Sequence, residues 1–164
     1  MDLENYSNEE IILSALKSEI EANRLYLEIA GKLKNAFLKD KLKFIADEED
    51  RHRQFLEQMY RSEFPEKSIE LPGKTPVPLP EIDIKDETIK LSSIFEMAMT
   101  AELAANEFYN SFAERYSNSE NIVKTLRYFA TMELGHYRLF ELEKENMERF
   151  EDFDSESPMM HVGP

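Results

Sequence analysis

The sequence predicts an all-α protein built as a four-helix bundle. Glycine is scarce, with four residues in 164, and strand-like alternation of polar and apolar residues is hard to find. Apolar residues instead recur at three- and four-residue steps in four separate stretches, which is the period of an amphipathic helix. Four helices of this kind bury their apolar faces against one another, and 164 residues fit a single domain.

The four helices are expected at residues 8–34, 38–61, 91–116 and 121–150. Ser7 is the expected N-cap of the first helix, and Glu10, three residues further on, can complete a capping box with it. The tail at residues 151–164 is expected to be irregular. The single domain would therefore span residues 1–164.

A proline-rich crossover is expected between the second and third helices, at residues 62–90. Proline cannot continue a helix, so this stretch favours an extended connection. About twenty extended residues can span the length of a helix and leave the helices on either side parallel. The residues that break the helix are Pro65, Pro72, Gly73, Pro76, Pro78 and Pro80.

Composition limits the classes of function. The chain has no cysteine, so disulfides, thiolate metal sites and a catalytic thiol are excluded, and nitrogen and oxygen must hold any metal. The acidic, polar amino terminus is unlike a secretory signal and no stretch approaches membrane length, so a cytoplasmic protein without a membrane partner is expected. The formal charge of −14 disfavours nucleic acid as a partner, and no local basic patch is evident.

The two halves of the sequence repeat a chemical pattern. Each half contains Glu-x-x-Ala-x-x-x-Tyr and, about one helix later, Glu-x-x-His. The residues are Glu19, Ala22, Tyr26, Glu49 and His52 in the first half, and Glu102, Ala105, Tyr109, Glu133 and His136 in the second.

Each expected helix places one of these glutamates in its apolar stripe. Burying four carboxylates together is costly, because each loses its hydration and repels the others. No lysine or arginine falls on the four stripes, whereas two divalent cations would balance four carboxylates with both histidines neutral. Residues three apart share a helix face, so each Glu-x-x-His can present an oxygen and a nitrogen to one ion.

Glutamates on two helices and Glu-x-x-His on the other two form the ligand set of di-iron and di-manganese carboxylate bundles. We therefore expect two metal ions, with Glu49 and Glu133 bridging them and Glu19 and Glu102 each binding one ion. Nitrogen and oxygen ligands do not choose among iron, manganese and zinc. The predicted ligands are Glu19, Glu49, His52, Glu102, Glu133 and His136.

Tyr26 and Tyr109 are candidate catalytic residues that would act through the ligands. Each lies about two helical turns after a predicted ligand, so its hydroxyl could reach a ligand carboxylate on another helix. The alternative is a buried tyrosine bonded to a backbone carbonyl. Asp47, Glu48 and Glu107 lie off the ligand face and are expected to be solvated, and His161 is not expected to be a ligand.

Over about residues 8–150, these ligands, the repeated tyrosines and the mid-chain crossover resemble the rubrerythrin branch of the ferritin-like superfamily. The resemblance implies a ferritin-like bundle with a diiron centre that reduces hydrogen peroxide or reacts with dioxygen, in defence against oxidative stress, and a homodimer. Full-length rubrerythrins carry a rubredoxin-like domain with four cysteines. Because this sequence has no cysteine, its electrons would come from a separate protein such as a rubredoxin.

One position departs from the family pattern. Typical rubrerythrins have an additional carboxylate one turn after the third-helix ligand, where this sequence has Ala105, and Glu107 falls on another face. Without that carboxylate, the six predicted ligands resemble the set of bacterioferritin ferroxidase centres. Peroxide reduction, ferrous iron oxidation, iron storage in a ferritin-like shell and di-manganese catalase-like chemistry therefore stay open, as does a bundle that its metals merely stabilise.

Overall fold

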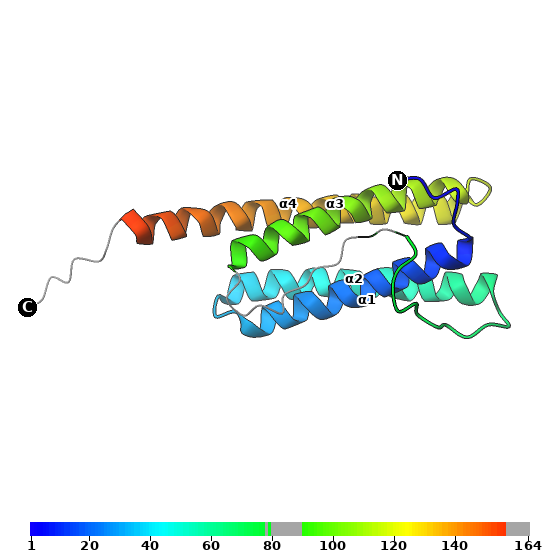
Figure 1. The fold of residues 1–164 in the computed structure, drawn as a ribbon, viewed down its shortest axis with the longest axis horizontal. Coiled ribbons are helices and arrows are strands. Elements are labelled where there is room, and N and C mark those ends of the chain that lie inside the picture. Colours follow the sequence, from blue (N-terminus) through cyan, green and yellow to red (C-terminus); the bar gives the residue numbers. More distant parts are fainter. Residues whose placement is uncertain (78, 80–89, 157–164) are drawn as a thin grey trace, which may run out of the picture. The chain divides into compact units, whose positions relative to one another are not determined.

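The computed structural model describes residues 1–77, 79 and 90–156, and it confirms the predicted all-α class. These residues contain no strand and form four helices, α1 (Asn8–Lys32), α2 (Ala36–Glu63), α3 (Leu91–Arg115) and α4 (Glu120–Glu156). The chain divides into two compact units, Met1–Leu79 with α1 and α2, and Pro80–Pro164 with α3 and α4. Within each unit the two helices lie side by side (Figure 1).

The first unit is a helical hairpin whose start is fixed by the predicted capping box. The Ser7 Oγ accepts from the Glu10 N–H at 3.2 Å, and the Glu10 carboxylate accepts from the Ser7 N–H at 2.9 Å. The Ser7 N–H bond and a second bond, in which the Ser7 hydroxyl donates to the same carboxylate at 2.7 Å, lower the pKa of Glu10. Asn35 caps α2 by accepting from the Leu38 N–H at 3.2 Å, and the short connection between the helices makes them antiparallel neighbours.

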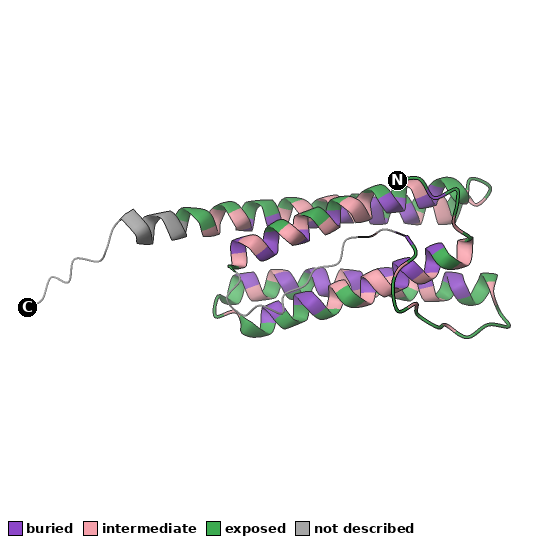
Figure 2. Ribbon diagram, viewed as in Figure 1, coloured by how far each residue is buried: buried purple, intermediate pink, exposed green. Residues whose placement is uncertain are grey.

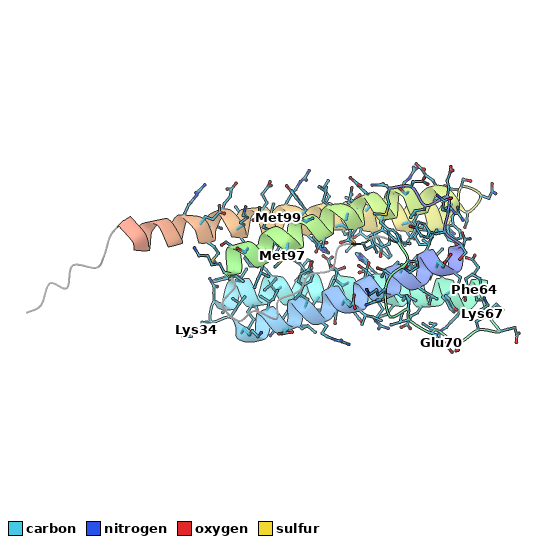
Figure 3. The ribbon with its side chains drawn as sticks, in the orientation of Figure 1. Lys34, Phe64, Lys67, Glu70, Met97 and Met99 are labelled. Carbon is cyan, nitrogen blue, oxygen red and sulfur yellow. The ribbon has the colours of Figure 1, made fainter. Side chains whose placement is uncertain are left out.

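The segment after α2 is held against the start of α1. Glu9 accepts from the Tyr60 hydroxyl at 2.9 Å and from Lys67 Nζ at 2.5 Å, and these two hydrogen bonds, that from Lys67 foremost, lower the pKa of Glu9. Lys67 also lies 5.2 Å from the ring centroid of Phe64 (Figure 3). Phe64 precedes Pro65, which disfavours helical backbone at Phe64 and so ends α2 there.

The expected crossover is described only in part. Residues 64–77 are non-helical, as predicted, whereas residues 78 and 80–89 lie outside the described residues. The path of the crossover therefore stays a prediction, and so does the expectation of a single domain.

The second unit is a hairpin of α3 and α4 with an aromatic core. The ring of Tyr109 meets Phe129 edge-on at 5.6 Å between centroids, and Phe95 packs on Phe140 at 5.5 Å. The Ser119 N–H donates to the Tyr116 carbonyl at 2.7 Å and closes the turn between the helices. These contacts join residues of α3 to residues of α4.

The helix bounds differ from the predicted ones mainly at the end of α4. The predicted irregular tail is wrong for residues 151–156, because α4 continues to Glu156. Neither glycine nor proline occurs between Gly135 and Pro158, and a proline disfavours helical backbone in the residue before it. The tail from residue 157 onward, including His161, lies outside the described residues.

Buried residues form stripes along the helices, and exposed residues cover the opposite faces (Figure 2). Core positions in the first unit include Ile12, Leu16, Leu42, Ile45 and Leu56, and those in the second include Phe95, Ala98, Phe112, Leu126 and Phe140. The expectation of one glutamate per apolar stripe is wrong for α4, which buries Glu143 in addition to Glu133. None of the described helices is both long enough and apolar enough to span a bilayer.

Candidate metal centre

The first unit brings together its three predicted ligands. Glu19 comes from α1, and Glu49 and His52 come from successive turns of one face of α2. The Nδ1 atom of His52 lies 3.2 Å from the Glu49 carboxylate and 3.6 Å from the Glu19 carboxylate. All three side chains are buried, His52 completely.

The second unit repeats this arrangement with α3 and α4. The Nδ1 atom of His136 lies 3.2 Å from the Glu133 carboxylate and 3.6 Å from the Glu102 carboxylate. Glu102, Glu133 and His136 are all buried. The two distances are the same as in the first unit, so the sequence repeat is also a repeat of side-chain geometry.

Each triad suits a divalent cation. One ligand atom from each of its members lies within 4.8 Å of the others, and the histidine nitrogen that faces the two carboxylates can complete a set of one nitrogen and two oxygen donors. Imidazole and carboxylate together suit iron, manganese and zinc. Among the described residues no lysine or arginine is buried.

An asparagine next to each triad ties its two helices together. Asn23, one turn after Glu19, donates from Nδ2 to the carbonyl of Ala46 at 2.7 Å. Asn106, one turn after Glu102, donates to the carbonyl of Ala130 at 2.5 Å. Both carbonyls lie about one helical turn before a ligand glutamate, so each hydrogen bond joins the two ligand-bearing helices within a turn of the triad.

The sequence prediction missed these two asparagines. A signal was available, because an asparagine follows each of Glu19 and Glu102 by four residues, in both halves of the repeat. Asparagine in a helix is usually explained as a solvated or locally bonded side chain. Only the position of the facing helix reveals the backbone carbonyl as its partner.

The tyrosines are placed as expected in one respect. Tyr26 and Tyr109 are both 1% exposed, and each lies two turns after the α1 or α3 ligand. Burial agrees with either predicted role, so donation to a ligand carboxylate stays a prediction. Of the acidic residues predicted to be solvated, Asp47 and Glu107 are exposed and Glu48 is half-buried.

Four helices that carry matched, buried Glu–Glu–His triads define a helical carboxylate–histidine protein of the ferritin-like class. More specifically, the chain belongs to the rubrerythrin family, which matches residues 10–144 and so includes all six predicted ligands. This confirms the resemblance seen in the sequence. Metal binding is a property of that family, and the clustered side chains are suited to it.

A solved structure supports the same fold. The hypothetical protein Pfu-1136390-001 from Pyrococcus furiosus is 32% identical to this chain, with a TM-score of 0.80. The similarity covers 91% of this chain and 95% of that one. No curated protein matches the sequence.

Proposed function

We propose that the chain is an oxidoreductase whose two triads together hold two iron ions and reduce hydrogen peroxide. The observation that carries this proposal is the pair of matched, buried Glu–Glu–His triads. With ionised carboxylates and a neutral histidine, each triad has two negative charges, which one divalent cation balances. Ions therefore remove the energetic cost of burying the carboxylates, and the family supports a shared dinuclear centre.

Under this proposal each hairpin contributes half of the ligands. Glu19 and His52 would hold one ion and Glu102 and His136 the other, and Glu49 and Glu133 would be shared between the two ions, as predicted from the sequence. When bound, a pair of iron ions would supply the two electrons that cleave the O–O bond of the peroxide. The carboxylates would keep the site anionic enough to retain both ions, and Tyr26 and Tyr109 would orient ligand carboxylates by hydrogen bonding.

The reaction requires an external source of electrons. Reduction of one hydrogen peroxide to two water molecules consumes two electrons and two protons. The 164 residues contain no cysteine, so they cannot form a rubredoxin-type iron site. We therefore propose a separate protein electron donor, such as a rubredoxin.

Oxidation of ferrous iron by dioxygen is the second candidate function. Ala105 occupies the position where an additional carboxylate would lie, and Glu107 is exposed on another face of α3. The six remaining ligands are those expected of a ferroxidase centre. In this alternative ferrous iron is itself a substrate, and the same six residues would serve it.

Anaerobic titration with ferrous iron tests the proposal. Elemental analysis should find close to two irons per chain, and peroxide should oxidise the reduced protein faster than dioxygen does. Glu133→Ala should lose iron and peroxide turnover, whereas Glu107→Ala, which removes an exposed glutamate of α3, should retain both.

The other outcomes of this titration separate the alternatives. Faster oxidation by dioxygen would favour the ferroxidase, and a large, mineral-loading particle would favour iron storage. Manganese retained in preference to iron would favour a catalase-like protein. Little or no metal after reconstitution would refute a dinuclear centre.

A further inference from the structure

A short basic segment stands out on this acidic chain. Residues 32–44 contain five lysines and one aspartate, a formal charge of +4, whereas the whole chain carries −14. These residues are a local concentration of basic side chains that the sequence prediction did not include. The segment covers the end of α1, the turn and the start of α2, with Lys34 at the turn itself (Figure 3).

Two exposed aromatic residues lie in the same segment. Phe37 is 85% exposed and Phe44 is 55% exposed. Phe37, Lys41 and Phe44 share one face of α2, because they are spaced four and three residues apart. We define the Lys/Phe patch as Lys34, Phe37, Lys41 and Phe44.

A single exposed apolar residue needs no explanation, but this arrangement is more specific. Exposed aromatic side chains with charged residues around them are typical anchors of protein–protein interfaces. Asp47 and Glu48 follow on α2, so this run of lysines ends with Lys43.

The other half of the repeat lacks the patch. Thr125 and Tyr128 follow Lys41 and Phe44 at the same sequence offset that relates His52 to His136. The ligands and the tyrosines are therefore repeated, whereas the lysines of the patch are not. Since the second hairpin forms without such a segment, the hairpin fold itself does not require it.

We propose that the Lys/Phe patch docks an acidic protein that delivers electrons to the metal centre. The inference rests on the proposed function. Phe44 precedes Glu49 by five residues and His52 by eight on the same helix, which is about 8 Å and about 12 Å along the axis. A carrier seated on the patch would thus have a short path to the triad of the first hairpin.

Charge complementarity selects this occupant over others. A second copy of the chain that met the patch across a two-fold axis would set lysines against lysines. Nucleic acid or an anionic membrane would extend beyond the patch and be repelled by the negative charge of the rest of the chain. A small acidic protein can contact the basic patch alone, and opposite charges would speed its encounter at low salt.

The electron balance sets how the carrier must work. Each peroxide takes up two electrons and two protons to give two water molecules. A reduced one-electron carrier must therefore dock, become oxidised and leave twice in each turnover. Such exchange needs a weak, rapidly dissociating interface, which suits a small patch of lysine and phenylalanine.

The test uses the full, iron-loaded chain with an acidic rubredoxin as electron donor and peroxide as oxidant. The double variants are Lys34→Glu with Lys41→Glu, and Phe37→Ser with Phe44→Ser. Each should raise the KM for rubredoxin about tenfold, and the charge variant should also abolish its salt dependence. The matched control variants on α4, Lys124→Glu and Tyr128→Ser, alter exposed residues and should change neither quantity.

A small-molecule reductant separates the two proposals. With dithionite as donor, the wild type and all the variants should reduce peroxide at the same rate. Failure of the wild type with both donors would refute the proposed function itself. An unchanged KM for rubredoxin in the patch variants, an equal effect of the control variants, or a changed oligomeric state in Phe37→Ser/Phe44→Ser would overturn the docking proposal.

Discussion

Removal of either interhelical asparagine hydrogen bond should destabilise the protein by a small, measurable amount. In Asn23→Leu the side chain keeps its approximate size but loses the donor to the Ala46 carbonyl. Such a bond contributes about 1 kcal/mol net. The Ala46 carbonyl still accepts the N–H of the residue four positions on within α2, so the larger penalty for an unsatisfied buried acceptor does not apply.

The expected loss can be measured by thermal unfolding of the metal-free full chain, followed by circular dichroism. About 1 kcal/mol corresponds to a decrease in Tm of about 2–4 °C for a chain of this length. Asn106→Leu should behave alike, because its Nδ2 likewise donates to a backbone carbonyl of the facing helix. The bonds lie in different hairpins, so the double variant should lose about 2 kcal/mol, close to the sum of the single losses.

Two comparisons make the test specific. Asn23→Asp should be less stable than Asn23→Leu at neutral pH, because an ionised carboxylate cannot donate and repels the carbonyl. Thr131→Val is the control, since it removes an exposed bond within α4 to the Arg127 carbonyl, and it should change stability by less than about 0.5 kcal/mol.

The same variants should also weaken metal binding. If the bond holds the two ligand-bearing helices in register, its loss should lower the affinity for ferrous iron about fivefold, which equals about 1 kcal/mol. Unchanged Tm and unchanged affinity in both Asn23→Leu and Asn106→Leu would refute this reasoning. So would a Thr131→Val control that matched them.

Four further predictions address the triads and the start of α1. Ferrous or manganous ion at about a hundredfold excess over Kd should stabilise the protein by about 2.7 kcal/mol, and calorimetry should find a smaller gain in His52→Ala. Glu49→Gln should raise the Tm of the metal-free protein by about 2–4 °C, because it removes one of the mutually repelling buried carboxylates. The same variant should gain less stability from added metal than the wild type does. A lower Tm of the metal-free variant would contradict this prediction. Ser7→Ala should cost about 1 kcal/mol in urea unfolding through loss of the N-cap. The hydrogen bond from Lys67 lowers the pKa of Glu9, so the ionised carboxylate stabilises the fold above its unfolded pKa of 4.5, and this stabilisation is lost as the pH falls through the folded pKa. Glu9→Gln should therefore reduce the loss of stability on acidification. An unchanged loss would show that the contact between Glu9 and Lys67 does not cause it.

Much of the fold followed from local signals in the sequence. The starts of α1 and α2 depended on the capping side chains of Ser7 and Asn35, and the end of α2 depended on Pro65. The predicted irregular tail was wrong at residues 151–156, because a helix continues until a residue stops it, and the first such residue is Pro158. Local sequence rules therefore predicted the helix ends that a helix-breaking residue causes, but not the continuation of a helix where no such residue occurs.

The candidate site divided in a similar way. The six ligands were predictable because carboxylates in an apolar stripe conflict with burial unless ions neutralise them, and that conflict is visible in the sequence. Asn23 and Asn106 present no such conflict, since a half-buried amide can be satisfied in many ways. Glu143 was missed because it falls seven residues after His136, beyond the repeated motif from which the ligands were read.

The two hairpins repeat the residues that two equivalent ions would require and differ at the surface. Each ion needs the same donors, so a glutamate, a second glutamate and a histidine recur at matched positions with the same distances. A redox partner needs only one place to dock, and an identical second patch would add nothing to the chemistry of the site. Phe44 has an exposed aromatic counterpart in Tyr128, but Phe37 and Lys41 have none, because Asn121 and Thr125 stand at the matching positions. This difference in charge between the hairpins is what a single place of electron entry would require, whereas hairpins that each only bind a stabilising metal would have no reason for it.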